Sequence, residues 1–274
     1  MNEMNAPLDT SLQPFLLSES SDGVATLTLN RGDRFNPLSQ AMVAALQAEL
    51  DRLALDTAVR VVIIAGSGKG FCAGHDLKEL RAHAEPPDSH GLAWQQELFD
   101  ACSRMMLSLT RLPQPVIARV HGIATAAGCQ LVSMCDLAVA GENARFALPG
   151  VNVGVFCTTP AVGVARNVAR KRAMEMLLTG ETIDARTALS WGLINRVVPE
   201  SELDAAIARF TDIIRARSAT VVALGKRAFY GQIERDIEGA YTFAGGVMAC
   251  NVLEPDAREG IDAFLGKRAP RWGG

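Results

Sequence analysis

Two glycine-rich segments, each following a predicted strand, carry the residues best suited to chemistry in this sequence. The first is Gly66-Ser-Gly-Lys-Gly-Phe-Cys-Ala-Gly74, and the second is His121-Gly-Ile-Ala-Thr-Ala-Ala-Gly-Cys-Gln130, which joins a strand to a helix. Small residues let the main chain approach a ligand closely, and the first turn of a helix offers N–H groups without partners. Two such segments can direct two N–H donors at one oxygen. That arrangement is an oxyanion hole, which suits a carbonyl that becomes an enolate or a tetrahedral anion.

Nucleotide binding is the alternative for the first segment, and its residues argue against it. A dinucleotide fingerprint requires glycine at the sixth position, where this chain has Phe71. A P-loop requires serine or threonine after Gly-Lys, where this chain has Gly70. A tight turn without a ligand remains the other interpretation of this segment taken alone.

The composition excludes several classes of protein. The chain has 274 residues, 49% of them hydrophobic, and its 27 Lys+Arg against 30 Asp+Glu give a net charge of -3. This balance argues against disorder and against a general nucleic-acid binder, which needs a concentrated basic face. The six cysteines form no CxxC pair and the four histidines form no metal-binding motif, so we expect no metal site. The first thirty residues contain no lysine or arginine, which argues against a signal or transit peptide and predicts a cytoplasmic protein with no membrane association.

Strands and helices alternate along most of the chain and position these two segments. Val24 to Asn30 has the alternation of a strand, and Arg60 to Ala65 is a β-branched run typical of a buried strand. Between them, Ser39 can cap a helix whose apolar residues recur every three or four positions. After residue 200 the sequence is almost entirely helical. We therefore predict an α/β fold with an N-terminal arm (1–21), a core (22–200) and a helical C-terminal region (201–274).

Several motifs in order along the chain resemble those of one family, the enoyl-CoA hydratase/isomerase or crotonase superfamily. They are Asn36-Pro-Leu-Ser, Phe71-Cys-Ala-Gly-His-Asp76, Val120 to Leu131, Cys135-Asp136, Leu178-Thr-Gly180, Ala188-Leu-Ser-Trp-Gly-Leu193 and Glu259 to Phe264. The resemblance covers about residue 22 to the C-terminus. It implies a spiral of β-β-α turns followed by a helical region that packs trimers, often paired into hexamers. It also implies an acyl-CoA thioester as substrate, with coenzyme A entering as part of the substrate and no separate cofactor.

The resemblance also assigns roles to individual positions. The two oxyanion donors fall at the main-chain N–H groups of His75 and Ala127. The imidazole of His75 could also lie near the thioester, as in some decarboxylases of the superfamily, or only its N–H could matter. Asp76 is expected to cap the helix that follows it. The positions expected to contact coenzyme A are Arg34, Phe71, Ala73 and Lys78, together with Phe264 and Lys267, which match positions that reach the coenzyme A of a neighbouring subunit.

Two departures from the family pattern bear on the reaction. Hydration needs one group to take a proton from water and another to protonate the α-carbon, and the family's hydratases use two glutamates. Those positions are Gln130, whose amide does not titrate, and Gly150, which has no side chain. Gln130 could orient a water or a substrate carbonyl, or serve only as a structural amide. We therefore expect thioester binding and enolate stabilisation with slow hydration, and a faster hydration when glutamate is restored at both positions.

These features leave several functions open. The first is an enzyme of the enoyl-CoA hydratase/isomerase type that works through an enolate. The second is a non-catalytic acyl-CoA binder or regulator that kept the pocket and lost the acid/base pair. Decarboxylation or thioester hydrolysis is a third.

Overall fold

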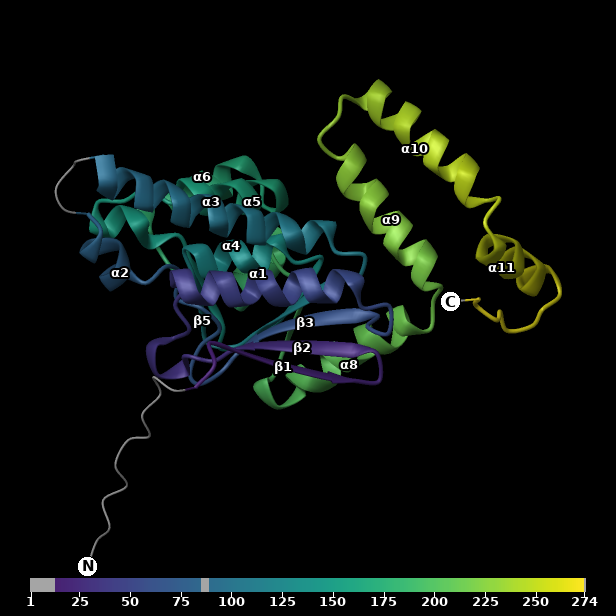
Figure 1. Ribbon diagram of the computed structural model, residues 1–274, viewed down its shortest axis with the longest axis horizontal. Helices are drawn as coiled ribbons and strands as arrows, with labels where there is room; N and C mark the ends of the chain where they lie inside the picture. The colour runs from purple at the N-terminus through teal and green to yellow at the C-terminus, as the bar shows by residue number, and fades with distance from the viewer. Residues whose placement is uncertain (1–12, 85–88, 274) are drawn as a thin grey trace, which may run out of the picture.

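Two β-sheets form the walls of the fold in the computed structural model, which describes residues 13–84 and 89–273. The larger sheet is parallel except for β1, and its strands in spatial order are β1 (Leu16–Ser21), β2 (Val24–Leu29), β3 (Val61–Gly66), β4 (Val116–Val120), β6 (Leu137–Gly141) and β9 (Arg196–Val198). The smaller sheet contains β5 (Ile123–Thr125), β7 (Arg145–Ala147) and β8 (Ile183–Asp184). Figure 1 shows the larger sheet with α1 above it and α8 below.

Successive turns of the chain alternate between the two sheets. Strand β4 of the larger sheet leads into β5 of the smaller one, and β6 leads into β7. Earlier turns of the chain extend the smaller sheet through isolated β-bridges, in which Leu38 pairs with His75 and Cys72 pairs with Ala124. Each turn therefore lies against the previous one, and the predicted crotonase-type spiral of the α/β class is confirmed.

The main core lies between the larger sheet and the long helices α1 (Gln40–Leu55) and α3 (Ser89–Arg111). Ser39 caps α1 as predicted, since its hydroxyl accepts from the Met42 N–H at 3.2 Å. A second apolar layer packs β3 against α8 (Leu203–Arg215), where Val61 and Leu203 are fully buried. Strand β3 is thus covered on both faces, which explains its continuous apolar sequence.

The N-terminal segment differs from the predicted arm. Leu16–Ser21 is a strand that pairs antiparallel with β2 through a turn at Asp22 and Gly23, both with positive φ (48° and 74°). Asp-Gly is a strong signal for such a hairpin. The strand was not predicted because its side chains are mostly exposed and polar, so the sequence shows no apolar alternation there. Residues 1–12 of the predicted arm lie outside the described residues.

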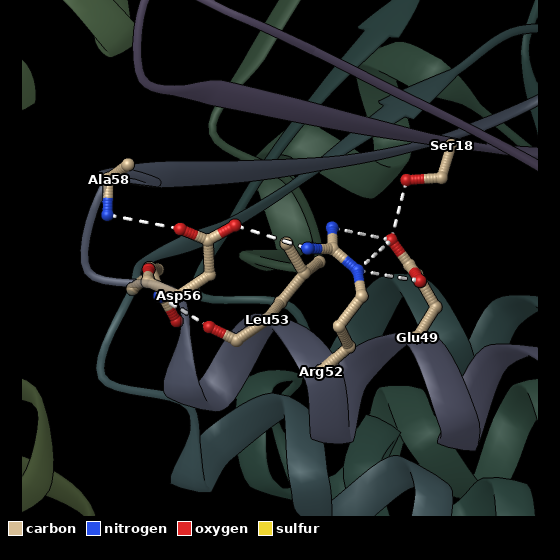
Figure 2. Close-up of polar contacts among 7 residues, drawn as sticks. Ser18, Glu49, Arg52, Leu53, Asp56 and Ala58 are labelled. Atoms are coloured by element: carbon tan, nitrogen blue, oxygen red, sulfur yellow. Dashed lines mark hydrogen bonds and ion pairs between the residues drawn. The ribbon is translucent and has the colours of Figure 1, made fainter.

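A polar cluster connects β1 to the end of α1 (Figure 2). The Ser18 hydroxyl donates to Glu49 at 2.6 Å, and Arg52 pairs with Glu49 at 2.8 Å and with Asp56 at 3.1 Å. The hydrogen bond from Arg52 lowers the pKa of Glu49. Asp56 also accepts from the Ala58 N–H at 3.1 Å, which orders the turn leading into β3. The cluster holds the edge hairpin against the helix that covers the sheet.

The chain beyond α8 forms a helical extension. Figure 1 shows α9, α10 and α11 reaching away from the body of the molecule on one side. Ser218 caps α9 by accepting from the Val221 N–H, and Asp236 caps α10 by accepting from the Gly239 N–H. The helices are α9 (Ala219–Gln232), α10 (Ile237–Asn251) and α11 (Pro255–Leu265), and their exposed apolar residues include Ile237, Tyr241, Met248, Phe264 and Leu265. Within the described ranges, none of the helices combines the length and apolarity that crossing a bilayer requires.

A buried ion pair attaches α9 to the body. Lys226 Nζ lies 2.6 Å from the Asp136 carboxylate and donates to the carbonyl oxygens of Leu109 at 2.7 Å and Gln114 at 2.8 Å. The Tyr230 hydroxyl donates to the same carboxylate at 2.9 Å. Burial lowers the pKa of Lys226, and the charge of Asp136 opposes that shift. These contacts give Asp136 a structural role, because its carboxylate joins α9 to the body of the protein.

Candidate active site

The two glycine-rich segments meet on adjacent turns of the spiral. Main-chain hydrogen bonds join them, from the Cys72 N–H to the Ile123 carbonyl at 3.0 Å and from the Thr125 N–H to the Cys72 carbonyl at 2.9 Å. The second segment then enters α4 (Ala127–Met134), and the first enters α2 (Leu77–Ala82). The structure therefore brings together the two loops that the sequence singled out.

Gly74 lies at one of the close approaches between these loops. Its φ is +94°, which side-chain-bearing residues rarely adopt, and a Cβ there would lie 2.9 Å from the Ala126 Cβ and 3.2 Å from the Ala127 nitrogen. Ala126 itself has a positive φ of 49°, and its N–H donates to the Ala147 carbonyl at 2.9 Å. The turn before α4 is thus held in a strained conformation by the neighbouring strand.

Two main-chain N–H groups at this junction are free. Across residues 13–84 and 89–273, neither the N–H of His75 nor the N–H of Ala127 has a hydrogen-bond acceptor. Ala127 opens α4, and no side chain caps that helix. The positive end of the helix dipole therefore adds to the attraction for a negative oxygen. The N–H groups of residues 75 and 127 are therefore both left without an acceptor among the described residues.

Asn36 holds the first loop in place, which sequence reasoning missed. Its fully buried side-chain amide donates to the carbonyl oxygens of Ser67 at 2.9 Å, Gly70 at 2.9 Å and Phe71 at 3.1 Å. Its oxygen accepts from the Arg31 N–H at 2.8 Å. In the sequence, Asn36 stands before proline in a turn-rich segment and begins the family motif Asn36-Pro-Leu-Ser, and neither signal reveals contacts more than thirty residues away.

His75 has a fixed side chain beside the free donors. Its Nδ1 lies 3.0 Å from the Leu38 carbonyl oxygen, and its ring meets the ring of Phe99 edge-on, with centroids 5.2 Å apart. Burial lowers the pKa of His75, and the hydrogen bond to Leu38 opposes that shift. The next residue, Asp76, caps α2 as predicted, because its carboxylate accepts from the Lys78 N–H at 2.9 Å.

Gln130 lies one helical turn beyond Ala127, on the same side of α4. Its side chain is 4% exposed, and its Oε1 is buried without a hydrogen-bond donor among the described residues. A buried amide oxygen without a partner is costly, so it is suited to accept from a group that a ligand or water brings. The amide itself cannot act as an acid or base.

Gly150 lies in the 3₁₀ helix Pro149–Val153, where a side chain has no room. A Cβ would overlap the Val155 carbonyl oxygen and lie 2.8 Å from the Cys157 sulfur, to which the Gly150 N–H donates. Burial raises the pKa of Cys157, so its sulfur stays a thiol at neutral pH. The expectation that glutamate at both 130 and 150 speeds hydration does not fit this geometry, because the loop folds back over the position.

The residues expected to contact coenzyme A differ in what they offer a ligand. Arg34 and Lys78 have exposed side chains. Phe71 is fully buried, so its ring belongs to the core and only its main chain faces the loop. Ala73 has both main-chain groups paired, its N–H to the Phe35 carbonyl at 2.8 Å and its carbonyl to the Thr125 hydroxyl at 3.0 Å. The two cations are thus the groups in this set that are open to a charged ligand.

The last two predicted contact residues lie elsewhere in the chain. Phe264 belongs to α11 and is 83% exposed, and Lys267 follows that helix and is also exposed. Figure 1 places α11 and α2 at opposite ends of the molecule. One chain therefore does not bring these residues to the candidate site, and their contact with the coenzyme A of a neighbouring subunit stays a prediction.

Comparison with known proteins identifies the family. The sequence pattern of the family described as Enoyl-CoA hydratase/isomerase matches residues 19–274. The chain belongs to the enoyl-CoA hydratase/isomerase family. A solved Mycobacterium smegmatis structure described as enoyl-CoA hydratase is 55% identical, with a TM-score of 0.91, and covers 96% of this chain and 100% of that one.

Two further relatives belong to one branch of the family, which this chain also resembles. Enoyl-CoA hydratase domain-containing protein 3 of mouse is 45% identical over 267 residues, which is 97% of this chain and 87% of the mouse protein. The crystal structure of human enoyl-CoA hydratase domain-containing protein 3 is 44% identical, with a TM-score of 0.89, and covers 94% of this chain and 100% of that one.

The predicted cytoplasmic location is wrong by the same comparison, since the mouse and human relatives are named as mitochondrial proteins. The prediction used only the absence of basic residues from the first thirty positions. The compartment of a protein is set by targeting segments that are removed from the mature chain. The residues that build the fold therefore do not indicate the compartment.

Proposed function

We propose that this family member binds an acyl-CoA thioester and stabilises its enolate through the main-chain N–H groups of His75 and Ala127. The supporting observation is that both donors lack an acceptor within the described residues, on loops that touch at Gly74. Main-chain donors fixed before the ligand arrives favour the developing oxyanion over the neutral carbonyl, by about 10²- to 10³-fold in rate per donor. Alanine at position 127 keeps the N–H that this role requires.

The proposed site stabilises an enolate better than it hydrates an alkene. Each acid or base missing from a hydratase costs roughly 10²- to 10⁴-fold in rate. Gln130 supplies an amide, and the crowding at Gly150 leaves no room for a second carboxylate. We therefore expect hydration of crotonyl-CoA to be slow even when the thioester binds well.

The same two positions favour a second candidate function, a non-catalytic acyl-CoA binder or regulator. Its distinguishing property is a thioester affinity without turnover. Decarboxylation of a malonyl-type thioester or hydrolysis of the thioester would instead leave a product that is easily detected. Decarboxylation differs from the other reactions in what it requires of the site, because it reaches an enolate without a base.

Calorimetry and turnover assays separate these functions. The protein is titrated with crotonyl-CoA and with free coenzyme A, and the acyl thioester is expected to bind more tightly because only it presents a carbonyl to the two donors. Turnover is then measured with crotonyl-CoA, a saturated acyl-CoA and malonyl-CoA at high protein concentration. Absence of thioester affinity would refute the proposed function. Affinity without turnover of any of the three would identify the binder.

We also propose that the helical extension mediates self-association as a trimer or a dimer of trimers. Exposed apolar side chains recur along α10 and α11, including Tyr241 and Phe264, and exposed apolar side chains of this kind are what self-association covers. Light scattering after size-exclusion chromatography tests this, and a monomer at micromolar concentration would contradict it. Association would also bring Lys267 of one subunit within reach of another.

A further inference from the structure

The imidazole of His75 is held in one tautomer. Its Nδ1 lies 3.0 Å from the carbonyl oxygen of Leu38, and a carbonyl oxygen only accepts hydrogen bonds. Nδ1 therefore carries the hydrogen of the neutral ring, and Nε2 presents a lone pair. Nε2 is fully buried and has no hydrogen-bond partner in the described part of the chain. A buried acceptor without a donor is unusual in a folded protein and points to a group supplied from outside.

The surroundings of the ring keep it neutral and oriented. Phe99 of α3 packs against it edge-on, which fixes the ring plane. The two carboxylates that flank it along the chain are occupied, since Asp76 caps α2 and Glu79 accepts from the Gln40 N–H at 2.9 Å. Burial is the largest influence on the pKa of His75 and lowers it, so the ring is uncharged at neutral pH.

The ring and one oxyanion donor belong to the same residue. A thioester whose oxygen rests on the N–H of His75 therefore lies within one short side chain of Nε2. Gln130 offers only an amide and Gly150 no side chain, so neither provides a base. His75 is thus a titratable side chain carried by one of the two proposed donor residues itself.

We infer that Nε2 of His75 is a catalytic base that removes a proton from the α-carbon of the bound acyl-CoA. The Nε2 lone pair takes the hydrogen as a proton, and the C–H electron pair becomes the carbon–carbon double bond of the enolate. The carbonyl π pair moves onto the oxygen that the two N–H groups hold. The imidazolium then returns a proton to carbon. This inference rests on the proposed function and extends it to acyl-CoA thioesters that carry an α-hydrogen.

Exchange of the α-hydrogens in D₂O tests the inference. Acetyl-CoA is incubated with the wild-type protein, and loss of its methyl signal is followed by proton NMR. His75→Asn is the key variant, because the asparagine amide can replace Nδ1–H as donor to Leu38 and the main-chain N–H is retained, while no base remains. His83→Asn is the matched control, because His83 is the exposed C-cap residue that follows α2. We expect an exchange rate about 10²- to 10⁴-fold lower for His75→Asn, with thioester affinity and the control unchanged.

The pH profile separates a base from a structural histidine. Wild-type exchange is expected to fall as the pH drops through an apparent pKa below 6.5, and the residual rate of His75→Asn should lack this decline. Wild-type exchange that survives in His75→Asn would overturn the inference and leave the proposed function intact. Thioester binding without wild-type exchange would also overturn it and identify the binder. Absence of thioester binding would remove both.

Discussion

Replacing Gly74 with alanine should damage the site through a single methyl group. The new Cβ would lie 2.9 Å from the Ala126 Cβ, 3.0 Å from the Thr125 carbonyl oxygen and 3.2 Å from the Ala127 nitrogen. The first of these contacts is shorter than real Cβ contacts allow, so the turn before α4 must shift. That shift moves the Ala127 N–H away from the N–H of His75, and the φ of +94° adds backbone strain that alanine does not relieve.

The expected magnitudes follow from these two effects. Backbone strain of this kind costs about 1–3 kcal/mol, which should appear as a lower free energy of unfolding in urea. Displacing one donor should lower the α-proton exchange rate about 10²- to 10³-fold. The displaced donor should also weaken thioester binding by up to roughly tenfold, which corresponds to the loss of about one hydrogen bond.

A matched glycine provides the control. Gly225 lies in α9 with ordinary backbone angles, and a Cβ there would meet nothing within 4 Å. Gly225→Ala is therefore expected to keep exchange and affinity unchanged and to raise the free energy of unfolding by up to about 1 kcal/mol. If Gly74→Ala stays folded and exchanges α-protons at the wild-type rate, the two loops do not form the donor pair.

Three further outcomes follow from other parts of the structure. Gly150→Glu combined with Gln130→Glu should not raise crotonyl-CoA hydration, and should lower stability, because position 150 is filled by neighbouring main chain; a faster hydration would show that the loop can open. Lys226→Met should lower the free energy of unfolding in urea by about 3–5 kcal/mol, since Asp136 stays buried without its partner, and adding Asp136→Asn should recover part of the loss. Because burial lowers the pKa of His75 below 6.5, the unfolded chain takes up that proton first as the pH falls. The free energy of unfolding should therefore decrease as the pH falls below about 6.5, and in His75→Asn this contribution should be absent.

Local signals in the sequence predicted much of the fold. Ser39 followed by apolar residues at helical spacing predicted α1, and the β-branched run before Gly66 predicted β3, because the periodicity and the cap are both encoded within a few residues. The smaller sheet could not be predicted in this way. Ile123–Thr125 is only three residues long, so its place in a sheet depends on the turns that lie beside it.

The candidate site was predictable in part for a similar reason. The two glycine-rich segments located the loops, and the family resemblance assigned the proposed donors within them. The contact between the His75 ring and Leu38, however, joins residues 37 positions apart. The crowding at Gly150 depends on how the chain returns through Val155, which no local pattern indicates. Sequence therefore located the loops, whereas their side-chain partners depended on the tertiary fold.

The bridges that join Leu38 to His75 and Cys72 to Ala124 make the proposed donor pair depend on three consecutive coils of the spiral. A partly folded chain that has formed only the first two coils holds the N–H of His75 in place. It lacks the N–H of Ala127, which completes the pair. Thioester recognition should consequently report completed assembly of the coils, and excess acyl-CoA should protect the protein against thermal unfolding by an amount that grows with the logarithm of its concentration divided by its dissociation constant.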